Sequence, residues 1–137
     1  MTTVEDTDEP LIQIGEGWAI APHIDALGDG MFRRARQPLG ITAVGMNVKV
    51  MQPDTSSRNH LHTQQQEIIF VHEGEIHVSF GDGTSHEVAA GGIVVIHPNN
   101  PHVVRVTSDE PAVLIMLGGQ GGVVDEPDHV FPEDATS

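Results

Sequence analysis

Short apolar segments separated by glycine and proline dominate this sequence. In residues 76–80, apolar residues alternate with His77 and Ser79, whereas residues 112–116 are continuously apolar. Two-residue alternation is typical of a strand with one buried face, and a short continuous apolar run is typical of a strand buried on both faces. No segment has a convincing helical periodicity. The pattern therefore predicts an all-β fold, either an antiparallel sandwich or a barrel.

The predicted strands are short and follow one another closely. They cover residues 11–14, 18–20, 41–51, 67–72, 76–80, 85–89, 93–96, 102–106 and 112–116. Residues 21–40 hold several glycines and prolines and are predicted to be irregular. The three arginines of this segment either form an anion-attracting lip or pair with surrounding acids, and solvated pairing is the commoner role of such a charge run.

The orientation of residues 67–72 predicts a homodimer. If Glu67 faces the interior, two-residue alternation turns Ile68 and Phe70 outward. Large apolar side chains on an outer face favour a partner subunit, and the apolar run 112–116 adds to the same argument.

The length of the chain predicts a single domain, and acidic residues are frequent at both of its ends. At 137 residues it is long enough for one sizeable core. We expect an acidic, flexible N-terminal tail at residues 1–10, one β-barrel domain at residues 11–122, and an acidic C-terminal tail at residues 123–137. Val130 and Phe131 offer apolar side chains that would anchor part of the second tail.

Composition excludes several classes of function. Six basic residues stand against twenty acidic ones, for a formal net charge of −14, which argues against binding to nucleic acid or to an anionic membrane surface. Cysteine is absent, so disulfides, thiolate metal sites and cysteine nucleophiles are excluded. Since there is no apolar leader and no apolar run long enough to span a membrane, the expected location is cytoplasmic.

The segment from His60 to Glu67 carries the strongest chemical signal. On a strand, alternation puts His60 and His62 on one face, and a short bend brings Glu67 to the same point. Two imidazoles and a carboxylate suit a divalent transition metal, and with coordination positions left open they resemble the facial arrangement of non-haem iron. Chance pairing is the alternative, because the chain holds nine histidines.

This spacing resembles the first motif of the cupin superfamily, in which His-x-His is followed after four residues by glutamate, here Glu67, and after six more by glycine, here Gly74. Residues 91–102 resemble the second motif, in which Gly91 matches the opening glycine and His102 matches the histidine. The resemblance covers roughly residues 40–118 and implies an antiparallel double-stranded β-helix, the jelly-roll barrel of cupins. The metal ligands that it implies are His60, His62, Glu67 and His102.

Four positions depart from the cupin motifs. Asp54 and Asn99 stand where glycine is usual, His97 replaces a proline, and Val106 replaces an asparagine. Asparagine is the non-glycine residue that best tolerates positive φ, so the change at Asn99 is mild. His97 is a candidate general acid or base near the mouth of the site, and the alternative is a surface histidine at a strand end.

Arg58 is a second candidate outside the ligand set. It lies two residues before His60, so alternation would project it on the same face, where it would clamp a substrate carboxylate. The alternative is an arginine that points to solvent at a strand entry. Spacing predicts no role for the remaining histidines, which are His23, His72, His77, His86 and His129.

The resemblance implies one divalent transition metal, with Fe, Mn, Zn, Ni, Co and Cu all open, and a small-molecule ligand or substrate. Such proteins include dioxygenases, isomerases, decarboxylases and lyases that act on small carbonyl or carboxylate compounds. The ligand set fits redox-active iron, which favours a dioxygenase-like oxidoreductase. The alternatives are a redox-inert, metal-dependent isomerase or lyase, a non-catalytic module for ligand binding or sensing, and a cupin that has lost its metal.

Overall fold

The computed structural model of the protein describes residues 11–119 and 128–132. The predicted N-terminal tail, residues 1–10, lies outside the described residues, as does most of the predicted C-terminal tail. The location of the protein in the cytoplasm stays a prediction.

Strands account for most of the described chain, together with two short helices. The first half contains β1 (Gln13–Gly15), β2 (Trp18–Ile20), the 3-10 helix η1 (Ile24–Leu27), β3 (Phe32–Arg34), α2 (Arg36–Leu39), β4 (Gly45–Met51) and β5 (Leu61–His62). The second half contains β6 (Gln66–Glu73), β7 (Glu75–Phe80), β8 (Ser85–Ala89), β9 (Ile93–Ile96), β10 (His102–Val106), β11 (Ala112–Gly119) and β12 (His129–Val130). No helix among these residues is long and apolar enough to cross a membrane.

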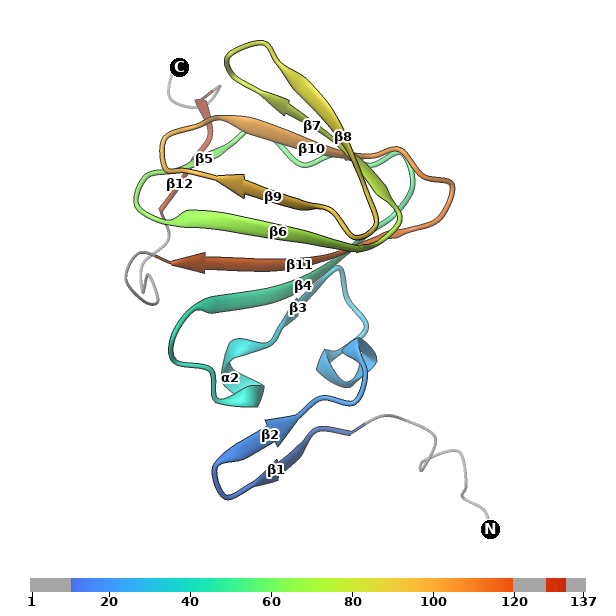
Figure 1. Cartoon of the computed structure of the whole chain (residues 1–137), viewed down its shortest axis with the longest axis vertical. Helices are drawn as coiled ribbons and strands as arrows, with labels where there is room; N and C mark the ends of the chain where they lie inside the picture. Colours follow the sequence, from blue (N-terminus) through green and yellow to red (C-terminus); the bar gives the residue numbers. More distant parts are fainter. Residues whose placement is uncertain (1–10, 120–127, 133–137) are drawn as a thin grey trace.

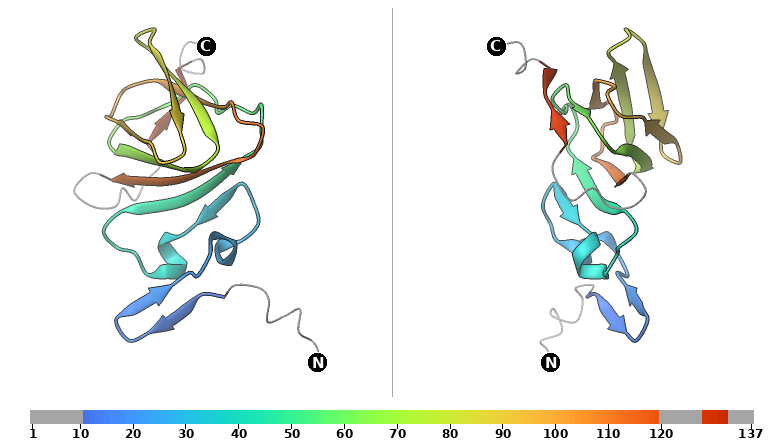
Figure 2. Two further views of the ribbon diagram at one scale, coloured as in Figure 1. Left: turned by 45° about the vertical axis from the view of Figure 1, so that its right-hand side comes forward. Right: turned by 90° about the vertical axis from the view of Figure 1, so that its left-hand side faces the viewer.

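Two antiparallel sheets form the body of the molecule. A five-stranded sheet in the order β3-β4-β11-β6-β9 crosses its middle, and a three-stranded sheet in the order β10-β7-β8 lies above it in Figure 1. The pair β12-β5 continues the second layer, because His60 and His102 form a β-bridge beside β10. The hairpin β1-β2 projects from the opposite end (Figure 2). Within the described residues the hydrogen-bonded strands do not close into a barrel.

The all-β, antiparallel prediction is therefore confirmed, and most predicted strands are present. The prediction for residues 21–40 is wrong, because this segment forms η1, β3 and α2, and β3 adds to the edge of the large sheet. The strand predicted at residues 41–51 begins only at Gly45.

The core lies between the two sheets and comes from their facing sides. Its buried residues are Met51, Ile69, Val71, Ile76, Val78, Ile96, Val104, Val106, Ala112 and Leu114. On β6 the predicted alternation is confirmed, since Glu67 and Ile69 are buried while Ile68 and Phe70 are only partly buried. The central position of β11 in the large sheet explains why its first three residues are buried without alternation.

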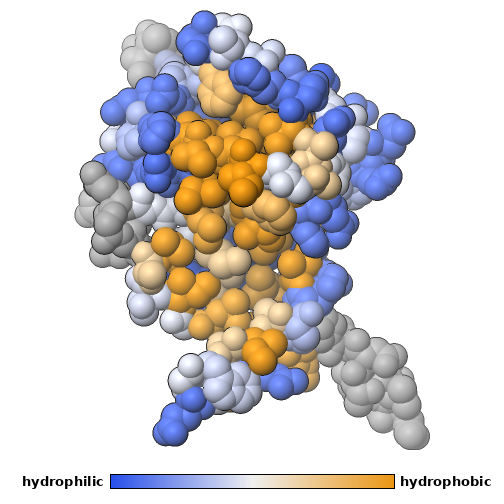
Figure 3. Space-filling model, viewed as in Figure 1, coloured by the Kyte–Doolittle hydropathy of each residue, from blue (hydrophilic) through white to orange (hydrophobic). Residues whose placement is uncertain are grey.

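The outer face of the large sheet is apolar across several strands. Figure 3 shows this area as a broad hydrophobic patch over β6, β9 and β11. Ile68 and Phe70 pair in register with Val95 and Ile93, and the last two are 48% and 64% exposed. The homodimer stays a prediction, and light scattering of the protein at micromolar concentration tests it.

Two turns take the positive φ that the cupin motifs assign to glycine. Asp54 has φ 63° and Asn99 has φ 68°, and these are the positions where the motifs usually carry glycine. Asparagine and aspartate adopt this left-handed conformation more readily than other residues with a Cβ. Gly74 is different, because at φ 81° an added Cβ would also lie 2.8 Å from the Cα of Ala112. A residue with a Cβ is therefore tolerated at positions 54 and 99, whereas position 74 requires glycine.

Candidate metal centre

Three segments bring the four predicted ligands to one place. His60 and His62 flank Leu61 at β5, His102 opens β10, and Glu67 is the second residue of β6. The His60–His102 bridge joins the first segment to β10, with backbone hydrogen bonds of 2.9 and 3.2 Å in the two directions. The short bend at residues 63–65 lets Glu67 face the same interior point from the opposite sheet.

Glu67 is the centre of the cluster. Its Oε1 lies 3.2 Å from Nε2 of His102, and its Oε2 lies 3.4 Å from Nε2 of His62. The His60 ring is 4.3 Å from that of His102 and 5.4 Å from that of His62, measured between centroids. One ligand atom each from His60, Glu67 and His102 lies within 4.8 Å of the other two. All but the half-buried His60 are buried, so the structure brings together the four residues that the sequence singled out.

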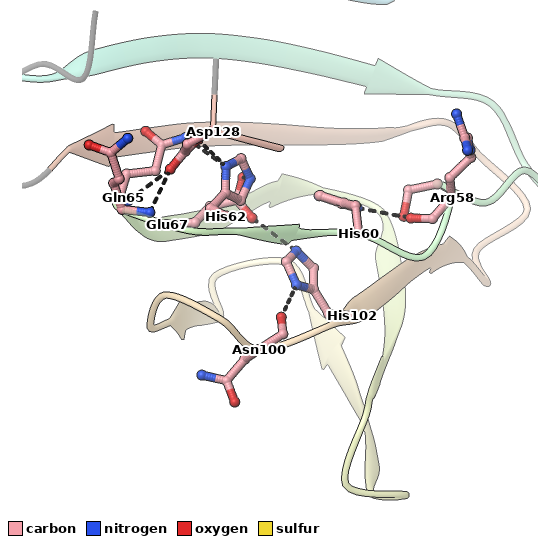
Figure 4. A network of polar contacts seen from close by, with 10 residues as sticks. Arg58, His60, His62, Gln65, Glu67, Asn100, His102 and Asp128 are labelled. Carbon is pink, nitrogen blue, oxygen red and sulfur yellow. Dashed lines mark hydrogen bonds and ion pairs between the residues drawn. The ribbon is translucent and has the colours of Figure 1, made fainter. Parts of the chain in front are cut away.

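Each of the three imidazoles is held from behind through Nδ1 (Figure 4). The acceptors are the carbonyl of Arg58 for His60 at 2.9 Å, Oδ1 of Asp128 for His62 at 3.0 Å, and the carbonyl of Asn100 for His102 at 2.9 Å. A carbonyl or carboxylate at Nδ1 fixes the proton on that nitrogen and leaves the Nε2 lone pair available. With Nδ1 occupied in each ring, Nε2 of His62 and Nε2 of His102 face the carboxylate of Glu67.

Asp128 contacts the candidate site, and the sequence prediction missed it. Besides the His62 ring, its carboxylate accepts the backbone N–H of Gln64 at 3.0 Å and of Gln65 at 2.9 Å. The Gln65 amide nitrogen lies 3.2 Å from Asp128 Oδ1 and 2.8 Å from Nδ1 of His62. Because both nitrogens are donors in this arrangement, Asp128 accepts from each of them. Asp128 was assigned to an acidic tail, and no spacing within that tail distinguishes it from its acidic neighbours.

His129 was also missed and lies beside the predicted ligands. Its ring is 4.2 Å from that of His62 and 5.6 Å from that of His60. Potential ligand atoms of His60, His62 and His129 form a second group in which all lie within 4.8 Å of one another. The pairing of β12 with β5 causes this proximity, since His129 is the register partner of His62. That pairing joins residues 67 positions apart, and no local pattern signals it.

Burial and the neighbouring charges set the protonation of the cluster. Burial lowers the pKa of His60, and the His102 ring acts in the same direction. Burial also opposes protonation of His62, but its contacts with Glu67 and Asp128 outweigh this and raise its pKa. For Glu67, burial is outweighed by His102 and His62, which hold its pKa far below the usual range. At neutral pH the cluster therefore combines an ionised carboxylate with a neutral His60.

The chemistry of these residues fits a divalent transition metal. Among the described residues, the buried Nε2 of His62 has no hydrogen-bond partner, although it lies 3.4 Å from a Glu67 oxygen. A buried lone pair without a donor is costly, and a cation supplies the missing partner. Imidazole nitrogens with one carboxylate suit Zn, Cu, Fe, Ni, Co or Mn, whereas Mg and Ca prefer oxygen ligands alone.

A cavity of about 580 Å³ opens from this cluster between the sheets. His60, Glu67, His102 and His129 are among the residues that line it, together with an apolar wall that includes Ile69, Val104, Leu114 and Met116. Two-residue alternation in the sequence predicts that Ile69, Val71 and Val104 line a pocket; Ile69 and Val104 line this cavity, whereas Val71 lies in the core. An apolar cavity with a few convergent polar groups is typical of a small-molecule site.

Of the two further candidates, one reaches the cavity and one does not. Arg58 lines the cavity, and its guanidinium lies over the Phe131 ring at 3.8 Å. His97 is exposed, accepts a hydrogen bond from the Gln66 amide at 3.0 Å, and lies on a separate surface depression. The structure therefore gives no support to His97 as an acid or base at the mouth, and its position fits the alternative of a surface histidine.

Comparison with known proteins supports the fold. A conserved protein with a double-stranded β-helix domain from Klebsiella pneumoniae is 18% identical with a TM-score of 0.66, covering 80% of this chain and 88% of that one. A cupin protein from Bacteroides fragilis is 16% identical with a TM-score of 0.65, covering 82% and 92%. The DMSP lyase DddQ from Ruegeria pomeroyi is 23% identical with a TM-score of 0.54, covering 65% and 43%.

No curated protein matches the chain. Residues 47–118 match the family of the cupin domain, which is 72 of 137 residues and includes all four clustered side chains. The double-stranded β-helix of the similar structures agrees with this match. The protein belongs to the cupin domain family.

Proposed function

We propose that this protein is a mononuclear metal-dependent enzyme that acts on a small molecule in the cavity, with His60, His62, Glu67 and His102 as the metal ligands. The observation that carries the proposal is the shared arrangement of the three imidazoles, each held through Nδ1, with Nε2 of His62 and His102 against the Glu67 carboxylate and His60 grouped with Glu67 and His102. A hydrogen bond of this kind, at the ring nitrogen that does not bind the metal, orients a metal-binding histidine and raises its basicity.

A bound metal would supply an electrophilic centre that polarises a substrate oxygen and, if redox-active, would also exchange electrons with the substrate. The chain itself supplies the walls, the charges and a proton acceptor. His129 lines the cavity, and burial together with the nearby His62 lowers its pKa. A neutral imidazole at this place can accept a proton from a substrate held against the ligands.

Within this class, oxygen-dependent oxidation is the first activity to test, because three nitrogens and one carboxylate fit redox-active iron and leave positions open. A redox-inert isomerase or lyase is the second candidate, since His129 can serve as a base without any change in metal oxidation state. DddQ, one of the similar structures, is a lyase by name.

A non-catalytic ligand-binding or sensing module is the competing class. It would be favoured if His129 also bound the metal, because its ring belongs to the second group of potential ligands with His60 and His62. Five protein ligands would leave little room for a substrate at the metal.

Spectroscopy of the metal in the purified protein, before and after exposure to air, tests the proposal. A change in the oxidation state of the metal, together with oxygen consumption during a screen of small carbonyl and carboxylate compounds, supports oxygen-dependent oxidation. A stable redox-inert metal directs the screen to isomerase and lyase products. A metal that responds neither to air nor to any compound, in wild type and in His129→Gln alike, contradicts an enzymatic role.

A further inference from the structure

Basic side chains are concentrated at the cavity. The chain has only six Lys and Arg residues against twenty acidic ones. Three of the six, Arg33, Lys49 and Arg58, line the cavity. In a chain with a formal net charge of −14, half of the positive charge therefore surrounds one small-molecule site.

The two arginines already have partners at the rim. Arg33 forms an ion pair with Asp25, Nη1 to Oδ1 at 2.8 Å, and its Nε donates to the carbonyl of Gly30 at 3.0 Å. The Arg58 guanidinium lies over the ring of Phe131 at 3.8 Å. These contacts hold both guanidinium groups in place as parts of the rim.

Lys49 is placed differently, on the wall of the cavity. It is the only lysine of the chain, and in register it lies between Phe32 on β3 and Leu114 on β11. Its Nζ is 4.8 Å above the Phe32 ring. Within the described residues it forms no ion pair with a carboxylate and no side-chain hydrogen bond. A half-buried ammonium without a carboxylate partner is costly to maintain, so the site gains from an anion that binds there.

The ammonium of Lys49 interacts electrostatically with Glu67, one of the proposed metal ligands. Burial lowers its pKa, and the carboxylate of Glu67 acts in the opposite direction. Between the two groups the cavity wall is apolar, formed by Ile69, Leu114 and Met116. Met116 and Leu114 follow each other on the inner side of β11, which lies between the strands of Lys49 and Glu67. One wall thus presents an ammonium, an aliphatic surface and the ligand cluster in that order.

We propose that Lys49 binds the carboxylate of an amphipathic monocarboxylate substrate, whose aliphatic body lies on Leu114 and Met116 and whose other end faces the metal ligands. A carboxylate matches the single ammonium, whereas a phosphate dianion would need further donors beside it. The orientation toward the metal rests on the proposed function, but the binding of a carboxylate at Lys49 does not.

The test is a titration of the full-length purified protein with hexanoate, with hexanamide as an uncharged probe of similar shape. Methyl-¹³C methionine labelling reports the site directly, because Met31, Met51 and Met116 line the cavity and Met46 does not. Hexanoate should shift the three cavity methyls and leave Met46 unchanged. Lys49→Met should weaken hexanoate binding at least tenfold and leave hexanamide binding within twofold of wild type, whereas Lys49→Arg should restore part of the hexanoate affinity.

Arg105→Met is the matched control, since Arg105 is exposed on β10 and does not line the cavity. This variant should bind hexanoate like wild type. Equal hexanoate affinity in wild type and Lys49→Met, equal affinity of wild type for the two probes, or no shift of the cavity methyls would each overturn the proposal.

A second measurement needs no variant. Because Lys49 is the only lysine, ¹³C-lysine labelling gives a single Cε signal, which should move with hexanoate and not with hexanamide. Repeating the titration after metal removal separates the two proposals. Carboxylate binding that depends on Lys49 in a protein that takes up no metal would contradict only the proposed function, and metal uptake with no role for Lys49 would contradict only this inference.

Discussion

Residues 60–67 and residues 128–132 lie side by side at the candidate metal centre, but they contribute to it in different ways. The first segment supplies three of the proposed ligands within eight positions. The second supplies Asp128 behind His62 and His129 beside it, from more than 60 positions further along the chain. Ligand identity is thus encoded locally, whereas ligand orientation and protonation depend on a long-range pairing of β5 with β12.

The largest effect should come from the ligands themselves. Glu67→Gln removes the only carboxylate among the four and should weaken metal binding more than ~100-fold, because it leaves three neutral imidazoles around a dication. Equilibrium dialysis against zinc measures this. His97→Gln, a change of an exposed histidine outside the cavity, should bind zinc like wild type. Equal losses in both variants would show that the clustered residues are not the ligands.

The orienting carboxylate should have a smaller effect. Asp128→Asn keeps the shape of the side chain but removes the charge behind His62, and the expected loss of zinc affinity is about 10- to 100-fold. The chain offers a matched control in Glu87→Gln, because Glu87 pairs with Nδ1 of His77 at 2.8 Å on the surface. Zinc binding should be unaffected by that change. If both variants behaved alike, residues 128–132 would have no special role at the centre.

The pH dependence of zinc binding should follow the protonation of His62. Its pKa in the metal-free protein is raised, so a proton competes with the metal as the pH falls through a value above the usual 6.5 of histidine. Affinity should then fall by about tenfold per pH unit, and more steeply once His60, whose pKa is lowered, also takes up a proton. We expect release of the metal below about pH 5.5.

In Asp128→Asn the pKa of His62 should be lower, because one of the carboxylates that raise it is gone. The onset of the affinity loss should therefore move to lower pH. Zinc affinity that stays constant down to pH 4 in wild type would mean that histidines are not the ligands.

A smaller effect is expected at the turn before His102. Asn99 has φ 68°, and its backbone N–H donates to the carbonyl of His62 at 2.7 Å. Asn99→Ala should lower the free energy of unfolding by about 1 kcal/mol, because alanine tolerates the left-handed conformation less well, and Asn99→Gly should cost less. Denaturant unfolding of the metal-free protein measures both. Equal stability of the alanine and glycine variants would mean that the turn relaxes to another conformation.

The sequence alone predicts the strands and the cluster of proposed ligands because both leave local signals. Alternation places Glu67 and Ile69 inward, and the motif spacing selects His102. Asp128, His129 and Lys49 leave no such signal, because their places depend on which strands pair and in which register. For His97 the motif departure left two alternatives open, and its exposed position away from the cavity fits the surface histidine.

Metal content and coordination test the central claim most directly. Elemental analysis of untagged protein, grown without added metal, should find close to one transition metal per chain, and X-ray absorption should find three imidazole nitrogens and a carboxylate oxygen around it. No metal in the purified protein, even after reconstitution, or a metal without imidazole neighbours, would contradict the account.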